Sequence, residues 1–307
     1  MVASQDDPSD ICPPEYVISP CTCIKICFWC NILLKCSNIS HQGELQEVFE
    51  KSKDWSFSHI YIEDSDFMYI PSDDIVKKRV TNLYLTNNTM ISLFDKPPPQ
   101  SNVLREMYLR NLTFRTGLKW EVFSSLHGLG ILEVKNSAIP EIDQTFERYF
   151  PQRVTWLFLN STNTKQLSDD SFSKLTELSR LHVQNSEIKE LKRSMFPPRS
   201  KLIDLNFSDS PISTLPYDIF SNMPNLQGVF LSHTNIVTIE ETVFGQIFSQ
   251  LYFFYMEGNE IDCNCQMKWL TKQDEFPTNL KVTCTKPKSV EGLSISELRP
   301  SHFAHCE

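Results

Sequence analysis

The sequence is poor in glycine, in clustered positive charge and in long hydrophobic runs. Only 8 of its 307 residues are glycine, so the Gly-rich loops that hold phosphates and dinucleotides are scarce. Its formal net charge is −9, and no basic run is longer than Lys77-Lys78-Arg79, which leaves little to neutralise a nucleic-acid backbone or an anionic lipid surface. No stretch reaches the roughly 18 apolar residues of a membrane span. These absences argue against nucleic acid as a partner and against a transmembrane segment in this chain.

Cysteine is absent from most of the chain. All 10 cysteines lie either between Cys12 and Cys36 or between Cys263 and Cys306. Two terminal clusters are typical of a protein that is stapled by disulfides in an oxidising compartment. We therefore expect a secreted protein whose signal peptide is not present in this chain, because the start, Met1-Val-Ala-Ser-Gln-Asp-Asp7, lacks the apolar core of such a peptide.

Zinc is the alternative use for such clusters. The pairs Cys21-Thr-Cys23 and Cys263-Asn-Cys265 leave one residue between the sulfurs, whereas structural zinc sites usually have two to four. Cys27-Phe-Trp-Cys30 does have the two-residue gap of a zinc or redox pair. We interpret it as an additional disulfide, Cys27–Cys30, and a free pair remains the alternative.

Signatures of catalysis are missing. The sequence has no Gly-x-Ser-x-Gly turn, no His-Glu-x-x-His motif and no calcium loop. His302, His305 and Cys306 form a compact trio that would suit a metal, but a disulfide-bonded cysteine beside two solvated histidines explains it more simply. We therefore predict no catalytic residues, no cofactor and no metal, and hence that the protein is not an enzyme.

A repeat dominates the middle of the chain. Counted from an apolar residue as slot zero, apolar side chains recur at slots three, five, ten and thirteen, with a further aromatic or aliphatic residue near slot eighteen. Successive copies are 24 or 25 residues apart and begin at Val80, Leu104, Leu129, Val154, Leu178, Leu202, Leu226 and Leu251. Apolar residues at slots three and five, between polar or aromatic ones, predict a short strand. One strand cannot bury its own apolar face, so the copies must stack.

This pattern resembles the leucine-rich repeat. The resemblance implies an α/β solenoid with a curved parallel sheet on its concave side and short helices or irregular turns on its convex side. In the consensus of this family slot eight is Asn, as in Asn88 and Asn259, but most copies here have Ser or Thr, and Leu112 stands in one. A hydroxyl group can form part of the same hydrogen bonds, so we expect a weaker ladder.

The two cysteine clusters resemble the flanking modules of secreted leucine-rich-repeat proteins. After the last repeat, Cys263-x-Cys265 is followed by Trp269-Leu270 and two spaced cysteines, as in the C-terminal module. The pairings implied by this resemblance are Cys12–Cys23 and Cys21–Cys36 at the N-terminal end, and Cys263–Cys284 and Cys265–Cys306 at the C-terminal end. We accordingly expect an N-terminal cap over residues 12–56, about nine repeats over residues 57–262 and a C-terminal cap over residues 263–306.

The chain opens with Cys12-Pro-Pro-Glu-Tyr-Val-Ile-Ser-Pro-Cys-Thr-Cys23, continues with the apolar Ile32-Leu-Leu-Lys-Cys-Ser-Asn-Ile39, and then repeats every 24 or 25 residues. This plan is most similar to arthropod secreted leucine-rich-repeat proteins that act as accessory, non-catalytic subunits. This resemblance implies a scaffold that binds another extracellular protein through the concave sheet, as an accessory subunit of a secreted enzyme does. The alternative is a fragment of a Toll-like or other leucine-rich-repeat receptor ectodomain.

Aromatic residues recur at slots two and four, which point away from the core, and such patches mark interaction surfaces. The competing interpretation is that these rings only pack against each other. The predicted partner-binding residues are Tyr61, Tyr84, Tyr108, Trp156, Phe158, Arg180, His182, Phe230, Phe253 and Tyr255.

Five Asn-x-Ser/Thr sequons add predicted glycosylation sites at Asn38, Asn87, Asn111, Asn160 and Asn206. A glycan on Asn206, at slot four, would project from the concave face and block part of it. The glycosylation sites therefore bear directly on where a partner can bind.

Overall fold

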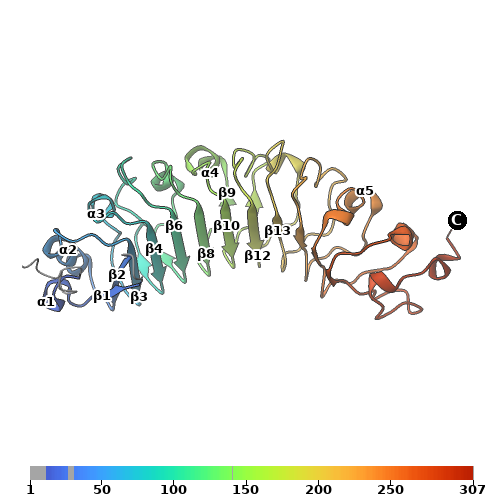
Figure 1. The fold of residues 1–307 in the computed structure, drawn as a ribbon, viewed down its shortest axis with the longest axis horizontal. Coiled ribbons are helices and arrows are strands. Elements are labelled where there is room, and N and C mark those ends of the chain that lie inside the picture. Colours follow the sequence, from blue (N-terminus) through green and yellow to red (C-terminus); the bar gives the residue numbers. More distant parts are fainter. Residues whose placement is uncertain (1–11, 27–30, 140, 307) are drawn as a thin grey trace, which may run out of the picture. The chain divides into compact units, whose positions relative to one another are not determined.

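The computed structural model describes residues 12–26, 31–139 and 141–306. The chain divides into two compact units, the first holding Met1–Ile139 and Arg148–Val154 and the second Pro140–Glu147 and Thr155–Glu307. Each unit has a curved, mostly parallel sheet with short helices and turns on its outer side (Figure 1). The division falls inside the predicted repeat array, and the expected boundaries of the two caps stay a prediction.

The sheet of the first unit begins with a hairpin and continues with parallel strands. β1 (Thr22–Lys25) pairs antiparallel with β2 (Ile32–Ser37), and β2 pairs parallel with β3 (His59–Glu63). The strands β4 (Asn82–Thr86), β6 (Glu106–Arg110) and β8 (Ile131–Lys135) follow in parallel. The remaining elements are α1 (Glu15–Ile18), α2 (Gln42–Lys51), α3 (Ser72–Lys77), the 3₁₀ helix η2 (Trp120–Phe123) and the small sheet of β5 (Thr89–Met90) and β7 (Thr113–Phe114).

The sheet of the second unit is parallel throughout. Its strands are β10 (Trp156–Asn160), β12 (Arg180–Gln184), β13 (Asp204–Asn206), β14 (Gly228–Phe230), β15 (Phe253–Tyr255) and β16 (Asn279–Lys281). The outer side carries the small sheet of β9 (Glu141–Ile142) and β11 (Gln166–Leu167), the helix α5 (Glu241–Phe244) and the 3₁₀ helices η3 (Arg193–Met195), η4 (Phe248–Gln250), η5 (Cys265–Lys272), η6 (Ile295–Glu297) and η7 (Pro300–Phe303). Helix α4 (Gln144–Tyr149) spans the division between the units.

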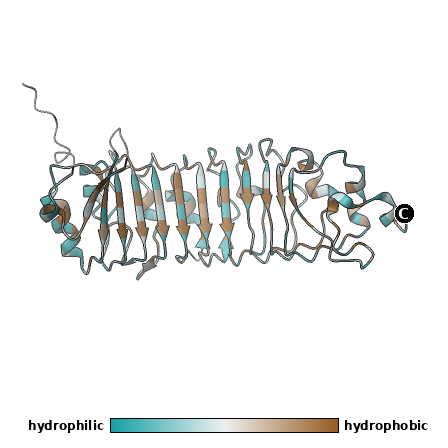
Figure 2. Cartoon of the chain, turned by 60° about the horizontal axis from the view of Figure 1, so that its bottom comes forward, coloured by the Kyte–Doolittle hydropathy of each residue, from teal (hydrophilic) through white to brown (hydrophobic). Residues whose placement is uncertain are grey.

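The repeat period accounts for the core of both units. Hydrophobic and hydrophilic residues alternate along the strands (Figure 2). Slots three and five are buried, for example Leu83 and Leu85 in β4 and Leu157 and Leu159 in β10. The phenylalanines near slot eighteen are buried as well, and neighbouring rings such as Phe220 and Phe244 have centroids 5.5 Å apart. Their predicted role in core packing is confirmed.

Slot eight forms a buried ladder of hydrogen bonds to the backbone. Asn88 accepts a hydrogen bond from the Ser65 amide (3.0 Å) and donates one to the Ile62 carbonyl (2.9 Å). Ser137 accepts one from the Leu112 amide (2.8 Å). A hydroxyl therefore does take over part of the role of the asparagine.

A second ladder, at slot seven of the first unit, was not expected from the sequence. Slot seven has a left-handed backbone, with φ between 50° and 55° at Asp64, Asn87, Asn111 and Asn136. The amide group of Asn136 donates to Asn111 (2.8 Å), Asn111 donates to Asn87 (2.8 Å), and Asn87 donates to the carboxylate of Asp64 (3.0 Å). Asparagine tolerates this backbone conformation because its short polar side chain can form local hydrogen bonds.

Disulfides lie near both ends of the chain, at the four pairings that the resemblance implies: Cys12–Cys23, Cys21–Cys36, Cys263–Cys284 and Cys265–Cys306. The expected bond Cys27–Cys30 lies outside the described residues. In the C-terminal module Trp269 is buried, and its indole N–H donates to the Ile239 carbonyl (2.9 Å), which ties the module to the repeat that begins at Leu226. Within the described ranges, no helix is long and apolar enough to cross a membrane.

Candidate functional site

The ten predicted partner-binding residues all lie on the open face, which we define as the face of each unit's sheet that carries slots two, four and six. All ten side chains are half-buried. Within a unit, slot-four residues are direct neighbours on adjacent strands, as Tyr61, Tyr84 and Tyr108 are in the first unit. In the second unit, Phe158 neighbours His182, and Phe230 neighbours Tyr255.

A stack of aromatic rings runs along the open face of the first unit. The rings of Tyr84 and Tyr108 are almost parallel, with an interplanar angle of 2° and centroids 4.9 Å apart. His59 stacks on Tyr84 at 6.1 Å, and Tyr61 lies 6.1 Å from Tyr84 at an angle of 33°. The rings do pack against one another, as the competing interpretation holds. Because they are still half-buried rather than buried, part of each ring faces outward.

Ion pairs frame this stack. Lys35 lies 5.3 Å from the centroid of the Tyr61 ring and 2.8 Å from the Glu63 carboxylate, which lowers the pKa of Glu63. At the other end Arg110 lies 5.6 Å from the Tyr108 centroid and pairs with Glu133 at 2.6 Å. Between them the Tyr108 hydroxyl donates to Glu106 (3.0 Å), and burial together with this hydrogen bond raises the pKa of Tyr108.

The open face of the second unit is more apolar. Trp156 and Phe158 have ring centroids 6.1 Å apart, and Phe158 lies 4.6 Å from His182. Phe230, Phe253 and Tyr255 form a second group, with centroid distances between 5.2 and 6.1 Å. A cation lies over a ring at each end of the column: Arg180 over Trp156 at 4.7 Å and Lys281 over Tyr255 at 4.9 Å.

Two titratable groups sit among these rings. Burial lowers the pKa of His182 to about 4, so the imidazole is neutral at physiological pH, and its Nε2 atom is buried without a hydrogen-bond partner among the described residues. Asp204 pairs with Arg180 at 3.1 Å, but its side chain is only 17% exposed and burial raises its pKa. Desolvation therefore exceeds the effect of Arg180 on this carboxylate.

Gly228 is a site residue that sequence reasoning missed. It occupies slot two of β14, and a Cβ atom built on it would lie 2.5 Å from Asp204 Oδ1 and 2.8 Å from the Phe230 ring. Any side chain here would displace both groups. The signal was available, since a glycine inside a strand marks a close approach of another group to the backbone.

The sequons differ in how well they can carry a glycan. Asn38, Asn87 and Asn111 are exposed and Asn160 is half-buried. Asn206 is only 7% exposed, and its Oδ1 atom accepts a hydrogen bond from the Ser208 amide (2.9 Å). The Asn206 side chain is therefore folded into the surface, and the five predicted glycosylation sites stay a prediction.

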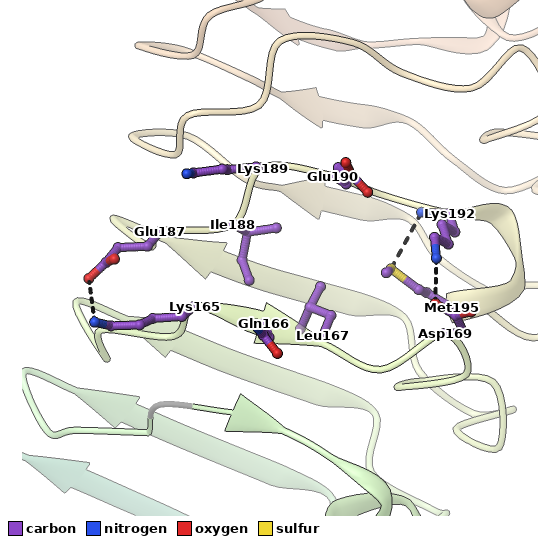
Figure 3. Close-up of a pocket in the computed structure, with 10 residues that line it drawn as sticks. All are labelled: Lys165, Gln166, Leu167, Asp169, Glu187, Ile188, Lys189, Glu190, Lys192 and Met195. Atoms are coloured by element: carbon purple, nitrogen blue, oxygen red, sulfur yellow. Dashed lines mark hydrogen bonds and ion pairs between the residues drawn. The ribbon is translucent and has the colours of Figure 1, made fainter.

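The outer side of the second unit has a groove of about 440 Å³ between two neighbouring repeats (Figure 3). Backbone hydrogen bonds join these repeats at Glu187–Thr164 (2.9 Å) and at Phe172–Met195 (2.8 Å). Leu167 and Ile188 lie in the groove. The charges around it largely neutralise each other, since Lys165 faces Glu187 at 3.7 Å and Lys192 pairs with Asp169 at 2.6 Å.

At the C-terminal end, Cys265, His305 and Cys306 place their side-chain nitrogen and sulfur atoms within 4.8 Å of one another. Both cysteines are joined in a disulfide, so neither has a thiolate for a metal. His302 is not part of this group, and its Nδ1 atom accepts a hydrogen bond from the Arg299 amide (3.2 Å).

By its fold the chain is a leucine-rich-repeat protein, with stacked parallel strands, short outer helices and disulfides at both ends. The family model described as "Leucine rich repeat" matches residues 176–236. The chain is 24% identical to keratocan of Bos taurus, covering 79% of this chain and 71% of that protein. It is 20% identical to the non-catalytic subunit of Oplophorus-luciferin 2-monooxygenase of Oplophorus gracilirostris, covering 96% of this chain and 88% of that subunit. These relatives indicate no catalytic family.

Solved structures share the fold. A chain of the octameric complex of Latrophilin 3, Unc5D and FLRT2 (LRR) is similar with a TM-score of 0.62 and 18% identity, over 85% of this chain and 86% of that one. The complex of TLR13 with the RNA ssRNA13 contains a similar chain with a TM-score of 0.61 and 18% identity, over 74% of this chain and 32% of that one. Neighbours of this fold thus occur in complexes with proteins and with a nucleic-acid ligand.

Proposed function

We propose that this protein is a non-catalytic extracellular scaffold that binds another protein through the open faces of its sheets. The observation that carries the proposal is the row of half-buried aromatic rings on each open face, eight tyrosine, tryptophan and phenylalanine residues that a solvent-facing sheet would not need. Aromatic side chains give much contact area at a low entropic cost, and they dominate the energetics of protein interfaces.

Two observations support the extracellular location. The four disulfides lie at the chain ends, where a solenoid must seal its core, and such bonds persist in oxidising compartments. The likeness to keratocan and to the Oplophorus subunit points the same way. The likeness to a subunit printed as non-catalytic favours an accessory role beside a secreted enzyme, and nothing in that role requires luciferin chemistry.

The test is a pull-down from native extracellular fluid with three baits made through a secretory pathway. One bait is the unchanged protein, the second carries Tyr84→Ser and Tyr108→Ser, and the third carries Phe230→Ser and Phe253→Ser. All three must show the same thermal stability. We expect a protein that the unchanged bait captures and that at least one double variant loses, which also assigns binding to one unit.

Capture that is equal for all three baits would exclude the open faces as the binding site.

The second candidate function, a ligand-binding part of a receptor ectodomain, is favoured by the likeness to the TLR13 chain, of which this chain spans 32%. Single-stranded RNA is therefore included as a competitor. Binding of RNA by the unchanged bait would contradict the expectation, based on a net charge of −9, that nucleic acid is not a partner.

A further inference from the structure

The open face of the second unit has a recessed carboxylate with unused hydrogen-bonding capacity. The side chain of Asp204 is 17% exposed, and among the described residues its only polar contact is the ion pair with Arg180. An ionised carboxylate accepts about four hydrogen bonds, and a partly buried one is costly unless these are formed. The protein itself leaves most of that capacity open.

Aromatic rings lie directly beside this carboxylate. Asp204 Oδ1 and the Phe230 ring both come within 3 Å of the point that a Gly228 Cβ would occupy, so they border the same small area of backbone. The absence of a side chain at Gly228 lets the Phe230 ring lie there. Phe253 continues the surface, at 6.0 Å from Phe230 and inclined by 28°.

Elsewhere the open faces place a cation over such rings. Lys35 lies over Tyr61, Arg110 over Tyr108, Arg180 over Trp156 and Lys281 over Tyr255, at 4.7 to 5.6 Å. In each case the cation also pairs with a carboxylate, namely Glu63, Glu133, Asp204 and Glu257. Over the described part of the chain, no lysine or arginine lies over Phe230 or Phe253, although Asp204 stands next to them.

From this geometry we infer that the surface of Phe230, Phe253 and Asp204 binds a lysine or arginine side chain of the partner protein. The incoming cation would face the ring of Phe230 and donate hydrogen bonds to the Asp204 carboxylate, as the four internal cations pair with a ring and a carboxylate. A net charge of −9 attracts a basic segment over longer distances. This inference rests on the proposed scaffold function, and it names the chemistry that the partner presents.

The probe is a synthetic hexapeptide of alternating arginine and glycine, compared with the same peptide in which citrulline replaces arginine. Citrulline keeps the shape and removes the charge. Binding to the whole protein is measured by calorimetry at low ionic strength. We expect the arginine peptide to bind more tightly than the citrulline peptide by about tenfold, the effect of one charge-assisted hydrogen bond.

Variants assign this preference to the site. Asp204→Asn and Phe230→Leu should each weaken binding of the arginine peptide by about tenfold, whereas binding of the citrulline peptide stays unchanged. The matched controls are Asp209→Asn, an exposed carboxylate of the same unit, and Tyr217→Leu, an exposed aromatic residue outside the open face. Each control should change binding by less than about twofold at a fixed salt concentration.

Equal losses in Asp204→Asn and Asp209→Asn would show that only the overall charge attracts the peptide, and would overturn the inference. Equal affinities for the two peptides would do the same. The scaffold proposal is tested separately, by the pull-down: a captured partner with no arginine preference refutes only the inference made here. If the protein prefers the arginine peptide but captures no partner in the pull-down, only the scaffold proposal is refuted.

Discussion

The Nζ atom of Lys78 donates hydrogen bonds to the backbone carbonyl and the hydroxyl group of Ser52, 26 residues earlier in the chain. Lys78 is 1% exposed, and its ammonium group lies 5.6 Å from the centroid of the Phe57 ring. Among the described residues no carboxylate contacts this buried ammonium group directly, which is unusual for a protein core. It makes the stability of the first unit depend on pH.

We predict that Lys78 weakens the protein near neutral pH. Burial lowers the pKa of Lys78 to about 8, below that of the unfolded chain, so between these two values the unfolded state binds more protons and stability rises with pH. Relative to Lys78→Met, the unchanged protein should gain about 1–3 kcal/mol between pH 7 and pH 10. Urea unfolding of both proteins at several pH values measures this. The control is Lys77→Met, an exposed neighbour, and the prediction fails if the two variants shift with pH in the same way.

The second unit should be sensitive to acid through His182. Burial lowers the pKa of His182 to about 4, below its value in the unfolded chain. The stability that the neutral imidazole contributes is therefore complete above the unfolded pKa and is lost as pH falls toward 4. Between pH 7 and pH 4 the variant His182→Phe should therefore lose less stability than the unchanged protein, by about 1–2 kcal/mol after allowance for partial exposure. Thermal melts across this range measure the difference. The control is His127→Gln, at an exposed position. The prediction is wrong if the stability of His182→Phe changes with pH as much as that of His127→Gln.

The slot-eight ladder gives a matched pair of substitutions. Asn88→Ala removes a buried side chain that satisfies two backbone groups, and we expect a loss of about 2–4 kcal/mol. Ser137→Ala leaves the Leu112 amide without its acceptor, and we expect about 1–2 kcal/mol. Denaturant unfolding measures both. A larger effect at Ser137 than at Asn88 would mean that the hydroxyl is the stronger rung.

Glycan occupancy should follow exposure. Glycopeptide mapping of the secreted protein is expected to find glycans at Asn38, Asn87 or Asn111, which are exposed, and none at Asn206. A chain that carries a glycan on Asn206 cannot fold that side chain into the open face. Substantial occupancy at Asn206 in folded, secreted protein would disprove this and would also close the surface beside Phe230.

Periodicity was sufficient to predict the strands, the buried slots and the open-face residues, because stacked strands constrain every copy in the same way. Tyr84 and Tyr108, 24 residues apart, had to be neighbours once the repeat length was known. The antiparallel hairpin of β1 and β2 was not predicted, because it lies in the N-terminal region, which does not follow the repeat.

What periodicity does not provide is the contact between side chains. Nothing in the spacing shows that Asp204 and Phe230 meet over Gly228, since this depends on which way each side chain turns. Burial of Asn206 was missed for the same reason: slot four points outward, and its exposure is decided by the bulk of the neighbouring rings. The groove in Figure 3 was not predicted either, since its shape depends on how the side chains of two neighbouring repeats, such as Leu167 and Ile188, pack.

The slot-seven ladder of the first unit has a direction, and a single residue sets it. A carboxylate can only accept, so Asp64 compels Asn87 to present its NH₂ group toward it. The oxygen of Asn87 then faces Asn111, whose own oxygen must face Asn136. Asp64 thus fixes the direction in which every hydrogen bond of this ladder runs. In Asp64→Asn the ladder could form the same number of hydrogen bonds in either direction.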